Sequence, residues 1–271
     1  MTIGVKEIEV KSVLSRCGIY GVDYSINPYI GCGHGCAYCF ARYVAKKIGR
    51  KSEEWGSFVY VKRNAPTVLK REIVKKKRGT VLMSSVTDPY QPLERKYNLT
   101  RKLLEILAFH DFPLTILTKS PLVLRDVSIL KRLSDVEVGF TIVTLDERAR
   151  ACFESHAPPI VERLEALRQL KKEGISTFVM LGPILPGISD RELKKYVEQM
   201  ADLKIDYLLV DRLNLKAGNW TSIKRALLNY DPKLLPLYEQ VLFRENDYFD
   251  KMKDKIGSIC KRYGIECVFC Y

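Results

Sequence analysis

The sequence predicts an α/β fold: a partial (βα)6 TIM-like barrel with parallel strands and a C-terminal helical extension. Short apolar runs alternate with amphipathic stretches over most of the chain, which is the pattern of βαβ units. The runs are almost continuously apolar, as are strands covered on both faces of a parallel sheet. Six such units are too few for an eight-unit barrel, so we expect the barrel to stay open.

The expected strands are short and rich in β-branched and other apolar residues. They lie at residues 23–30, 80–84, 113–118, 136–143, 175–181 and 207–210. The cysteine-rich loop that follows the first strand leads into a helix at residues 40–48 and a possible short strand at 58–61. The further helices are expected at residues 66–77, 100–110, 122–133, 160–173, 190–203 and 221–228.

These elements suggest three parts of the chain. Residues 1–22 form an N-terminal lead-in, residues 23–230 the barrel, and residues 231–271 a helical extension whose last segment carries three cysteines. The 271 residues suit one large domain, and their hydrophobic share of 46% is enough for a sizeable core.

Composition limits the class of protein. Apolar runs of about 18 residues are absent and the N-terminus lacks the apolar centre of a signal peptide, so we expect a cytoplasmic protein without a membrane span. Eight cysteines are too few for a disulfide scaffold in a chain of this length and suit metal or redox chemistry better. The net charge of +13 favours an anionic partner such as nucleic acid, although a lysine-rich solvated surface gives the same balance.

The most specific stretch is a glycine-rich loop with the sequence GCGHGCAYCF at residues 31–40. Its cysteines, Cys32, Cys36 and Cys39, have the spacing C-x3-C-x2-C. Three thiolates cannot complete the four-cysteine shell of an ordinary iron–sulfur cluster, but they can hold three corners and leave one iron open to a ligand. The alternative is a structural zinc site with His34 as the fourth ligand.

Polar side chains follow the strands and are expected to converge on one mouth, because the carboxyl ends of parallel strands lie at the same end of a barrel. The polar strand ends are residues 84–88, 118–120, 141–144, 182–183 and 211–214. The cysteine loop also follows a strand, so the sequence predicts a site where the loop faces these residues.

The loop resembles the signature of the radical S-adenosylmethionine superfamily, in which an aromatic residue, here Tyr38, precedes the third cysteine. The wider patterns NPYxGCxHGCxYCFAR at residues 27–42 and TDPYQPxE at residues 87–94 are similar to the branch of spore photoproduct lyase, also called DNA-repair-photolyase-like. The resemblance covers roughly residues 20–215.

The resemblance implies that Cys32, Cys36 and Cys39 hold a 4Fe–4S cluster whose fourth iron binds the amino and carboxylate groups of S-adenosylmethionine. An electron from a donor such as a ferredoxin or flavodoxin would reduce the cluster and cleave the sulfonium. The resulting 5′-deoxyadenosyl radical would take a hydrogen atom from the substrate.

The resemblance also implies further cofactor contacts. Tyr38 would lie beside the cofactor, and Ser85, Thr87 and Asp88 are the candidates for the amino group of S-adenosylmethionine. Lys119 resembles the lysine that pairs with its carboxylate, with an ordinary surface lysine as the alternative. The remaining candidates, each with a core or turn role as the alternative, are Thr141 and Thr144 near the ribose or carboxylate and Gly182 beside the adenine.

One departure from the branch concerns the hydrogen donor. Spore photoproduct lyase carries a cysteine near the end of the second strand, and residues 83–86 (MSSV) contain none. Thymine-dimer repair by that route is therefore not expected. Tyr90, or a cysteine from elsewhere in the chain, would have to serve as another radical relay.

The tail cysteines, Cys260, Cys267 and Cys270, allow three interpretations. With a fourth ligand such as Cys17 they could bind a second cluster or zinc. Cys267 or Cys270 could instead reach the substrate as a catalytic thiol. The third interpretation is that they are buried structural thiols among apolar neighbours.

Function is predicted in three versions. The first is a radical S-adenosylmethionine enzyme that repairs or modifies nucleic acid, supported by basic runs at residues 46–51 and 70–78 and by the nearby aromatic residues Trp55, Phe58 and Tyr60. The second is such an enzyme acting on a protein or a small metabolite. The third is an iron–sulfur or zinc protein without catalysis.

Overall fold

The computed structural model describes residues 3–216 and 218–271. Its main sheet has eight strands in the order β11-β10-β9-β8-β7-β6-β3-β2. Six neighbouring strands are parallel and follow chain order, as predicted. They are β3 (Tyr24–Ile26), β6 (Val81–Met83), β7 (Leu114–Thr118), β8 (Val136–Thr141), β9 (Ser176–Ile184) and β10 (Tyr207–Arg212).

The edges of this sheet do not pair with each other, so the barrel is open. At one edge β2 (Leu14–Arg16) runs antiparallel to β3. At the other edge β11 (Glu266–Phe269) runs parallel to β10. The C-terminal extension is therefore helical only in part, because its last segment adds a strand to the barrel sheet. The division of the chain at residue 230 stays a prediction.

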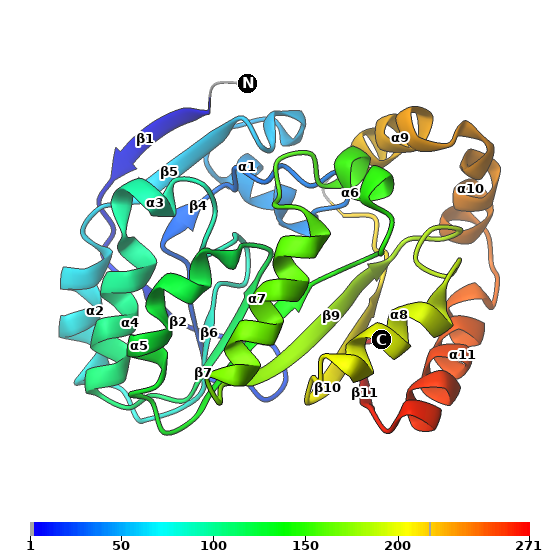
Figure 1. Cartoon of the computed structure of the whole chain (residues 1–271). Helices are drawn as coiled ribbons and strands as arrows, with labels where there is room; N and C mark the ends of the chain where they lie inside the picture. Colours follow the sequence, from blue (N-terminus) through cyan, green and yellow to red (C-terminus); the bar gives the residue numbers. More distant parts are fainter. Residues whose placement is uncertain (1–2, 217) are drawn as a thin grey trace.

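Helices cover the outer face of the sheet (Figure 1). Those expected at the strand connections are present as α2 (Ala65–Ile73), α4 (Leu99–Phe109), α7 (Ile160–Lys172), α8 (Leu193–Asp202) and α9 (Asn219–Tyr230). The extension contributes α10 (Leu235–Phe243) and α11 (Tyr248–Tyr263), and the short α1 (Tyr43–Lys47) lies within the predicted helix at 40–48.

Two connections differ from the sequence-based expectation. The helix expected at 122–133 is a 3-10 helix (Pro121–Asp126) followed by one turn, α5 (Val127–Leu130). Asp126 is fully buried there and pairs with Arg101 and Arg125, so tertiary ion pairs override the local helical pattern. Two unpredicted short helices are α3 (Glu94–Tyr97) and α6 (Glu147–Phe153).

A second, small sheet lies beside the cysteine loop. It consists of β1 (Gly4–Ile8), β5 (Phe58–Lys62) and β4 (Tyr29–Ile30), in the order β1-β5-β4. The strand considered at 58–61 is thus confirmed. The N-terminal lead-in supplies β1, so this segment belongs to the framework that carries the loop.

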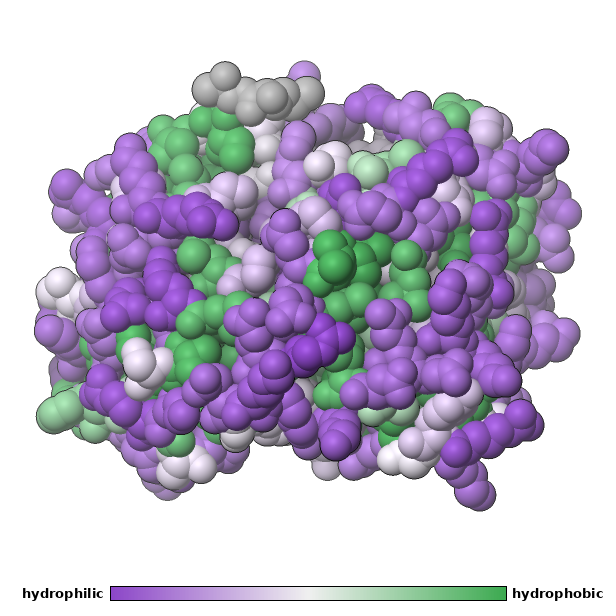
Figure 2. Space-filling view, viewed as in Figure 1, coloured by the Kyte–Doolittle hydropathy of each residue, from purple (hydrophilic) through white to green (hydrophobic). Residues whose placement is uncertain are grey.

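The core lies between the sheet and the helices. On β10, Leu208 and Val210 are fully buried and share one hydrophobic cluster with Val197 of α8 and Ile256 of α11. Full burial of such a side chain contributes roughly 1.5–3 kcal/mol. The face in Figure 2 is mostly hydrophilic, with hydrophobic side chains in separate patches. Among the described residues, no helix has the length and apolar character that crossing a membrane requires.

Candidate active site

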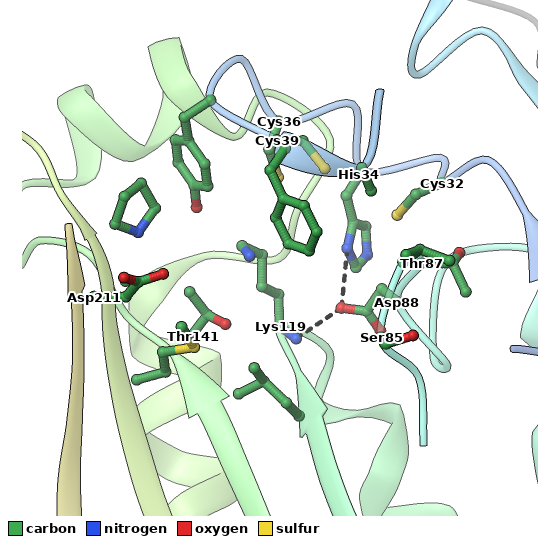
Figure 3. Close-up of a pocket in the computed structure, with 18 of the residues that line it drawn as sticks. Cys32, His34, Cys36, Cys39, Ser85, Thr87, Asp88, Lys119, Thr141 and Asp211 are labelled. Atoms are coloured by element: carbon green, nitrogen blue, oxygen red, sulfur yellow. Dashed lines mark hydrogen bonds and ion pairs between the residues drawn. The ribbon is translucent and has the colours of Figure 1, made fainter. Parts of the chain in front are cut away.

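A cavity of about 310 Å³ lies between the cysteine loop and the carboxyl ends of the strands. Ten of the predicted site residues line it: Cys32, Cys36, Tyr38, Cys39, Ser85, Thr87, Asp88, Lys119, Thr141 and Gly182. Figure 3 shows the cysteines on one wall and Lys119 and Thr141 at the ends of their strands facing them. The predicted meeting of loop and strand ends is therefore present.

Glycines let the cysteine loop pack tightly against the segment before β5. Gly56 has a φ of +98°, and a Cβ there would lie 2.8 Å from the Cα of Gly35. Gly31 has a φ of +87°, and its Cβ would lie 2.5 Å from the carbonyl oxygen of Phe58. Side chains at these positions would meet backbone, so the loop conformation requires glycine.

The second motif, at residues 87–94, holds the loop through its backbone. Gln91 is fully buried; its Oε1 accepts from Gly33 N at 2.9 Å and its Nε2 donates to Gly31 O at 3.3 Å. Thr87 Oγ1 donates to the same Gly31 carbonyl at 2.6 Å. These contacts make the second motif a clamp for the first.

The clamp continues on both sides of the loop. Tyr29 Oη donates to the buried carboxylate of Glu94. Asn27 Oδ1 accepts from the backbone N–H of Ser85 at 3.0 Å, and Asn27 Nδ2 donates to Ser85 Oγ at 3.1 Å. The two motifs are about fifty residues apart in the sequence. These hydrogen bonds join them into one unit.

Asp88 is hydrogen-bonded within this framework. Its carboxylate accepts from Thr118 Oγ1 at 2.7 Å, Lys119 N at 2.9 Å and Tyr90 N at 2.8 Å. His34 Nδ1 lies 3.3 Å from the same group (Figure 3). Burial by itself raises the pKa of Asp88, but the paired His34 and these donors lower it to about 2. Asp88 lies in the predicted cavity, with its oxygens already engaged by protein donors.

Ser84 is a polar residue that sequence reasoning placed at the strand end but did not select. Its side chain lines the cavity, and the residue is 6% exposed. Its Oγ has no hydrogen-bond partner within the described part of the chain. A buried hydroxyl without a partner is costly, so this group is suited to a ligand in the cavity. Its position as the first residue after β6 was the available clue.

Lys119 is a cavity residue and not a surface lysine. Its side chain is 14% exposed, and its Nζ lies 4.0 Å from Glu154 Oε1 and 5.6 Å from the centroid of the Tyr38 ring. Burial by itself lowers the pKa of Lys119, but Cys36 and Glu154 raise it above its usual value. An ammonium in this position can receive an anionic group.

Four predicted residues do not line this cavity: Tyr90, Thr144, Cys267 and Cys270. Thr144 lines a separate cavity of about 110 Å³, where its Oγ1 accepts from Asp146 N at 3.1 Å. It therefore supports the residue that caps α6. Tyr90 is 1% exposed and donates to Asp126 at 3.2 Å, so it is part of the buried polar network behind the clamp.

The tail cysteines are separated by the register of β11. Cys267 pairs with Leu208 and its thiol hydrogen-bonds to the buried Cys260 of α11, on the helix side of the sheet. Val210 pairs with Phe269, so Cys270 follows at the level of Asp211, which lines the cavity. Cys267 thus fits the structural interpretation, whereas Cys270 stands near the mouth.

Ligand geometry bears on the metal hypotheses. Of the residues that the structure describes, no three His, Cys, Asp or Glu side chains are arranged to hold a single metal ion. The zinc interpretation of the loop and a second metal site in the tail therefore gain no support. An iron–sulfur cluster is several atoms wide, so its thiols stand farther apart than the ligands of one ion.

The aromatic residues differ from the expectation for a stacking surface. Trp55 and Phe58 are 6% and 1% exposed and pack edge to face in the core beneath the loop, and Trp55 also lines the cavity. Phe40, which sequence reasoning did not select, is 48% exposed and lines the cavity. The exposed cations Arg212 and Lys216 line it as well.

The residues present fit a thiolate-bound cluster with a small zwitterionic ligand. Three free thiols of one loop line the same cavity as the ammonium of Lys119 and the Ser84 hydroxyl, which lacks a hydrogen-bond partner in the described part of the chain. Thiols suit iron, whereas an ammonium and a hydroxyl suit carboxylate and amino groups. Such a donor set can hold a metal cluster on one side and an organic ligand on the other.

Comparisons with known proteins agree with this geometry. Residues 26–200 match the family model of the Radical SAM superfamily. An uncharacterized protein of Methanocaldococcus jannaschii is 36% identical over 216 residues, which is 80% of each chain. A Pseudomonas phage M6 protein named Radical SAM Nalpha-GlyT isomerase is 23% identical over 225 residues, 81% of this chain and 45% of that protein.

The fold is also that of a solved enzyme. Spore photoproduct lyase complexed with dinucleoside spore photoproduct aligns with a TM-score of 0.74 and 13% identity, over 98% of this chain and 82% of that chain. The match of the family model over most of the chain, together with the cysteine loop at the mouth of the open barrel, identifies the family. The chain belongs to the radical S-adenosylmethionine superfamily.

Proposed function

We propose that this radical S-adenosylmethionine enzyme acts on nucleic acid, which it repairs or modifies. The observation that carries the proposal is the composition of the cavity's rim, where the exposed ring of Phe40 and the cations Arg212 and Lys216 line the same opening as the cysteine loop. Aromatic rings stack on bases and cations bind phosphates, so this combination suits an unstacked nucleotide.

The family implies a 4Fe–4S cluster and S-adenosylmethionine, which together supply a 5′-deoxyadenosyl radical that takes a hydrogen atom from the substrate. Cys32, Cys36 and Cys39 would hold the cluster. Lys119 would bind the carboxylate of S-adenosylmethionine. The Ser84 hydroxyl, which has no hydrogen-bond partner among the described residues, would bind its amino group.

The remaining cavity residues would shape the cosubstrate pocket. Thr141 and Gly182 lie at the ends of neighbouring strands, on the wall suited to the ribose and the adenine. A Cβ at Gly182 would lie 2.6 Å from the Met180 side chain and 3.4 Å from Asp211 Cβ, so a side chain larger than that of glycine would be crowded at this point of the wall. A low-potential donor such as a ferredoxin or flavodoxin would supply the electron.

Two further facts support a nucleic acid as the substrate, and a third concerns the type of reaction. The net charge is +13. The solved lyase of similar fold is complexed with a dinucleoside photoproduct. The phage relative is named an isomerase, so chemistry other than dimer repair occurs among proteins similar to this chain. Because residues 83–86 lack a cysteine, we favour a reaction other than the spore photoproduct repair itself.

The test measures cleavage of S-adenosylmethionine. The anaerobically reconstituted protein is reduced with dithionite and supplied with S-adenosylmethionine alone, or with single-stranded DNA, duplex DNA, RNA or a peptide mixture. We expect 5′-deoxyadenosine to form and a nucleic acid to increase its rate, while Cys36→Ala forms none. If the peptides increase the rate and no nucleic acid does, the substrate is a protein and not a nucleic acid. If no mixture yields 5′-deoxyadenosine, the protein is non-catalytic.

A further inference from the structure

We propose that Glu154 is a positioning residue for cosubstrate binding: its buried carboxylate fixes Tyr38 of the cysteine loop and orients the ammonium of Lys119. The two walls of the cavity would thus be aligned by one side chain outside it. The inference rests on the proposed pairing of Lys119 with the carboxylate of S-adenosylmethionine. It does not depend on the identity of the substrate.

Glu154 lies directly after α6 and is fully buried. Its Oε1 accepts a hydrogen bond from Tyr38 Oη, and its Oε2 lies 2.5 Å from Arg163 Nη2. The preceding residue, Phe153, accepts from the backbone N–H of Ala37 at 2.8 Å. The stretch between the second and third cysteines is therefore held at both its backbone and its aromatic side chain.

Arg163 of α7 anchors this carboxylate. The arginine is fully buried, and its Nη1 donates to Thr141 O at 2.9 Å. Its Nε and Nη2 donate to Pro158 O at 3.0 and 2.8 Å. Because these carbonyls belong to β8 and to the turn before α7, the guanidinium has one fixed position, and so has the carboxylate paired with it.

Lys119 lies on the open side of the same carboxylate. Its Nζ is 4.0 Å from Glu154 Oε1, which is too far for a hydrogen bond but close enough for strong attraction in a buried setting. The ring of Tyr38 lies 5.6 Å from Nζ and attracts it further. These contacts direct the ammonium to one place, and within the described residues its Nζ donates no hydrogen bond, so it can bind a second anion.

Stability alone is a poor reason for this arrangement. A buried ion pair contributes little that apolar side chains of similar volume would not, because both charges lose their hydration. Here the pair touches the cysteine loop on one side and a cavity lysine on the other. The arrangement therefore suits a geometric role in the site better than a general stabilising role.

The test compares cosubstrate affinity with cluster loading. The double variant Glu154→Gln/Arg163→Met removes both charges and so avoids leaving one buried and unpaired. The dissociation constant of S-adenosylmethionine is measured on the cluster-loaded protein by titrating the change in the EPR spectrum of the reduced cluster. We expect it to rise about tenfold or more, the usual effect of losing a residue that orients a ligand, with iron content per chain preserved.

Two single variants complete the design. Tyr38→Phe deletes only the hydrogen bond to Glu154 and is expected to raise the dissociation constant about threefold. Tyr207→Phe is its matched control, because Tyr207 Oη donates to Glu137 at 2.9 Å at the opposite ends of the strands. It is expected to leave the constant unchanged. If the double variant does not fold, Tyr38→Phe decides the matter.

If the double variant folds and its affinity for S-adenosylmethionine is unchanged, the proposal is overturned. If it does not fold, unchanged affinity in Tyr38→Phe overturns the proposal. An equal loss in Tyr207→Phe would also overturn it, because the effect would then be general loosening. Lys119→Met separates this inference from the proposed function. If this variant binds S-adenosylmethionine with normal affinity, the proposed pairing of Lys119 with the carboxylate is wrong, and with it the premise of the role of Glu154. Nucleic acid is absent from all these measurements.

Discussion

Gln91 joins two parts of the cysteine loop with one uncharged side chain. It is fully buried, accepts from Gly33 N and donates to Gly31 O, on either side of Cys32. Its Nε2 also donates to Thr87 Oγ1 at 3.0 Å. Deleting it leaves the buried Gly33 N–H without this acceptor, which costs about 1–3 kcal/mol, and removes one of the two donors to Gly31 O.

Gln91→Ala should therefore lower the free energy of unfolding and reduce the iron bound per chain after reconstitution. Denaturant unfolding of the apo protein and iron analysis measure the two effects. Gln169→Ala, which loses only an exposed hydrogen bond to Glu165, serves as the control and should change stability by less than about 0.5 kcal/mol. Normal iron content in Gln91→Ala would contradict the clamp.

The strand β11 shows how a secondary-structure element sorts neighbouring cysteines. Cys267 lies within β11 and faces α11. Cys270 follows the last residue of β11, Phe269, which pairs with Val210, so Cys270 lies at the level of Asp211. Burial and the nearby Asp211 raise the pKa of Cys270, which keeps its sulfur protonated at neutral pH. A protonated thiol is the form that can donate a hydrogen atom.

If Cys270 quenches the substrate radical, Cys270→Ala should change the product distribution without reducing cleavage of S-adenosylmethionine. Cys267→Ala is the comparison at the same strand, and it should affect stability more than products because it removes the bond to Cys260. Mass spectrometry of the products distinguishes the two variants. Identical products from Cys270→Ala and the unchanged protein would remove Cys270 from the reaction.

At the opposite end of the strands, Asp206, the residue before β10, joins α7 and β9. Its carboxylate contacts Lys171 Nζ of α7 at 2.6 Å and Ser176 Oγ at 3.1 Å, and accepts from Thr177 N of β9 at 2.7 Å. Partial burial raises the pKa of Asp206, but the hydrogen bonds from Lys171 and β9 outweigh it and lower the pKa overall. The ionised carboxylate therefore stabilises the fold.

Because the folded-state pKa is the lower one, this stabilisation is present above the unfolded-state value of about 3.9 and is lost as pH falls toward the folded value. The difference in free energy of unfolding between Asp206→Asn and the unchanged protein should be full above about pH 5 and narrow below it. Denaturant unfolding across this range measures it. A difference that grows on acidification would show that the sign is wrong.

The charge of the whole molecule matters most where it meets the cavity. Arg212 and Lys216 line the opening, whereas Lys75 and Lys76 are exposed beyond the end of α2, before the amino end of β6. All four contribute equally to the net charge of +13. Under the proposed function, only the first of these two pairs is placed to bind the phosphates of a nucleotide whose base enters the cavity.

Arg212→Ala/Lys216→Ala should weaken binding of single-stranded nucleic acid and reduce the dependence of log affinity on log salt by about 0.7 per lost phosphate contact. Lys75→Ala/Lys76→Ala loses the same charge and should keep the slope. Fluorescence anisotropy at several salt concentrations measures both. Equal losses in the two double variants would mean that binding follows net charge and not the cavity.

Much of the fold was predictable because its determinants are local. Apolar runs and helical periodicity predicted the six parallel strands, and too few units predicted an open barrel. The prediction of one helix at 122–133 was wrong because Asp126 forms ion pairs with Arg101 and Arg125. Only Arg125 is close to Asp126 in the sequence, so the local pattern does not reveal the pair with Arg101. The strand β11 was missed because its four residues become a strand only by pairing with β10.

The cysteine loop was determined by the sequence itself, because the spacing of three thiols within eight residues and the glycines between them define its chemistry without reference to the fold. The tertiary structure alone decided which polar residues serve that loop. Thr144 was predicted at the cavity but lies outside it, and Asp88 is hydrogen-bonded into the framework of the cavity. Ser84 and Glu154 were not selected from the sequence, and the structure places them in and beside the site. The reason is distance along the chain: Tyr38 and Glu154 are 116 residues apart, and only the packing of α6 and α7 against the strand ends brings them together.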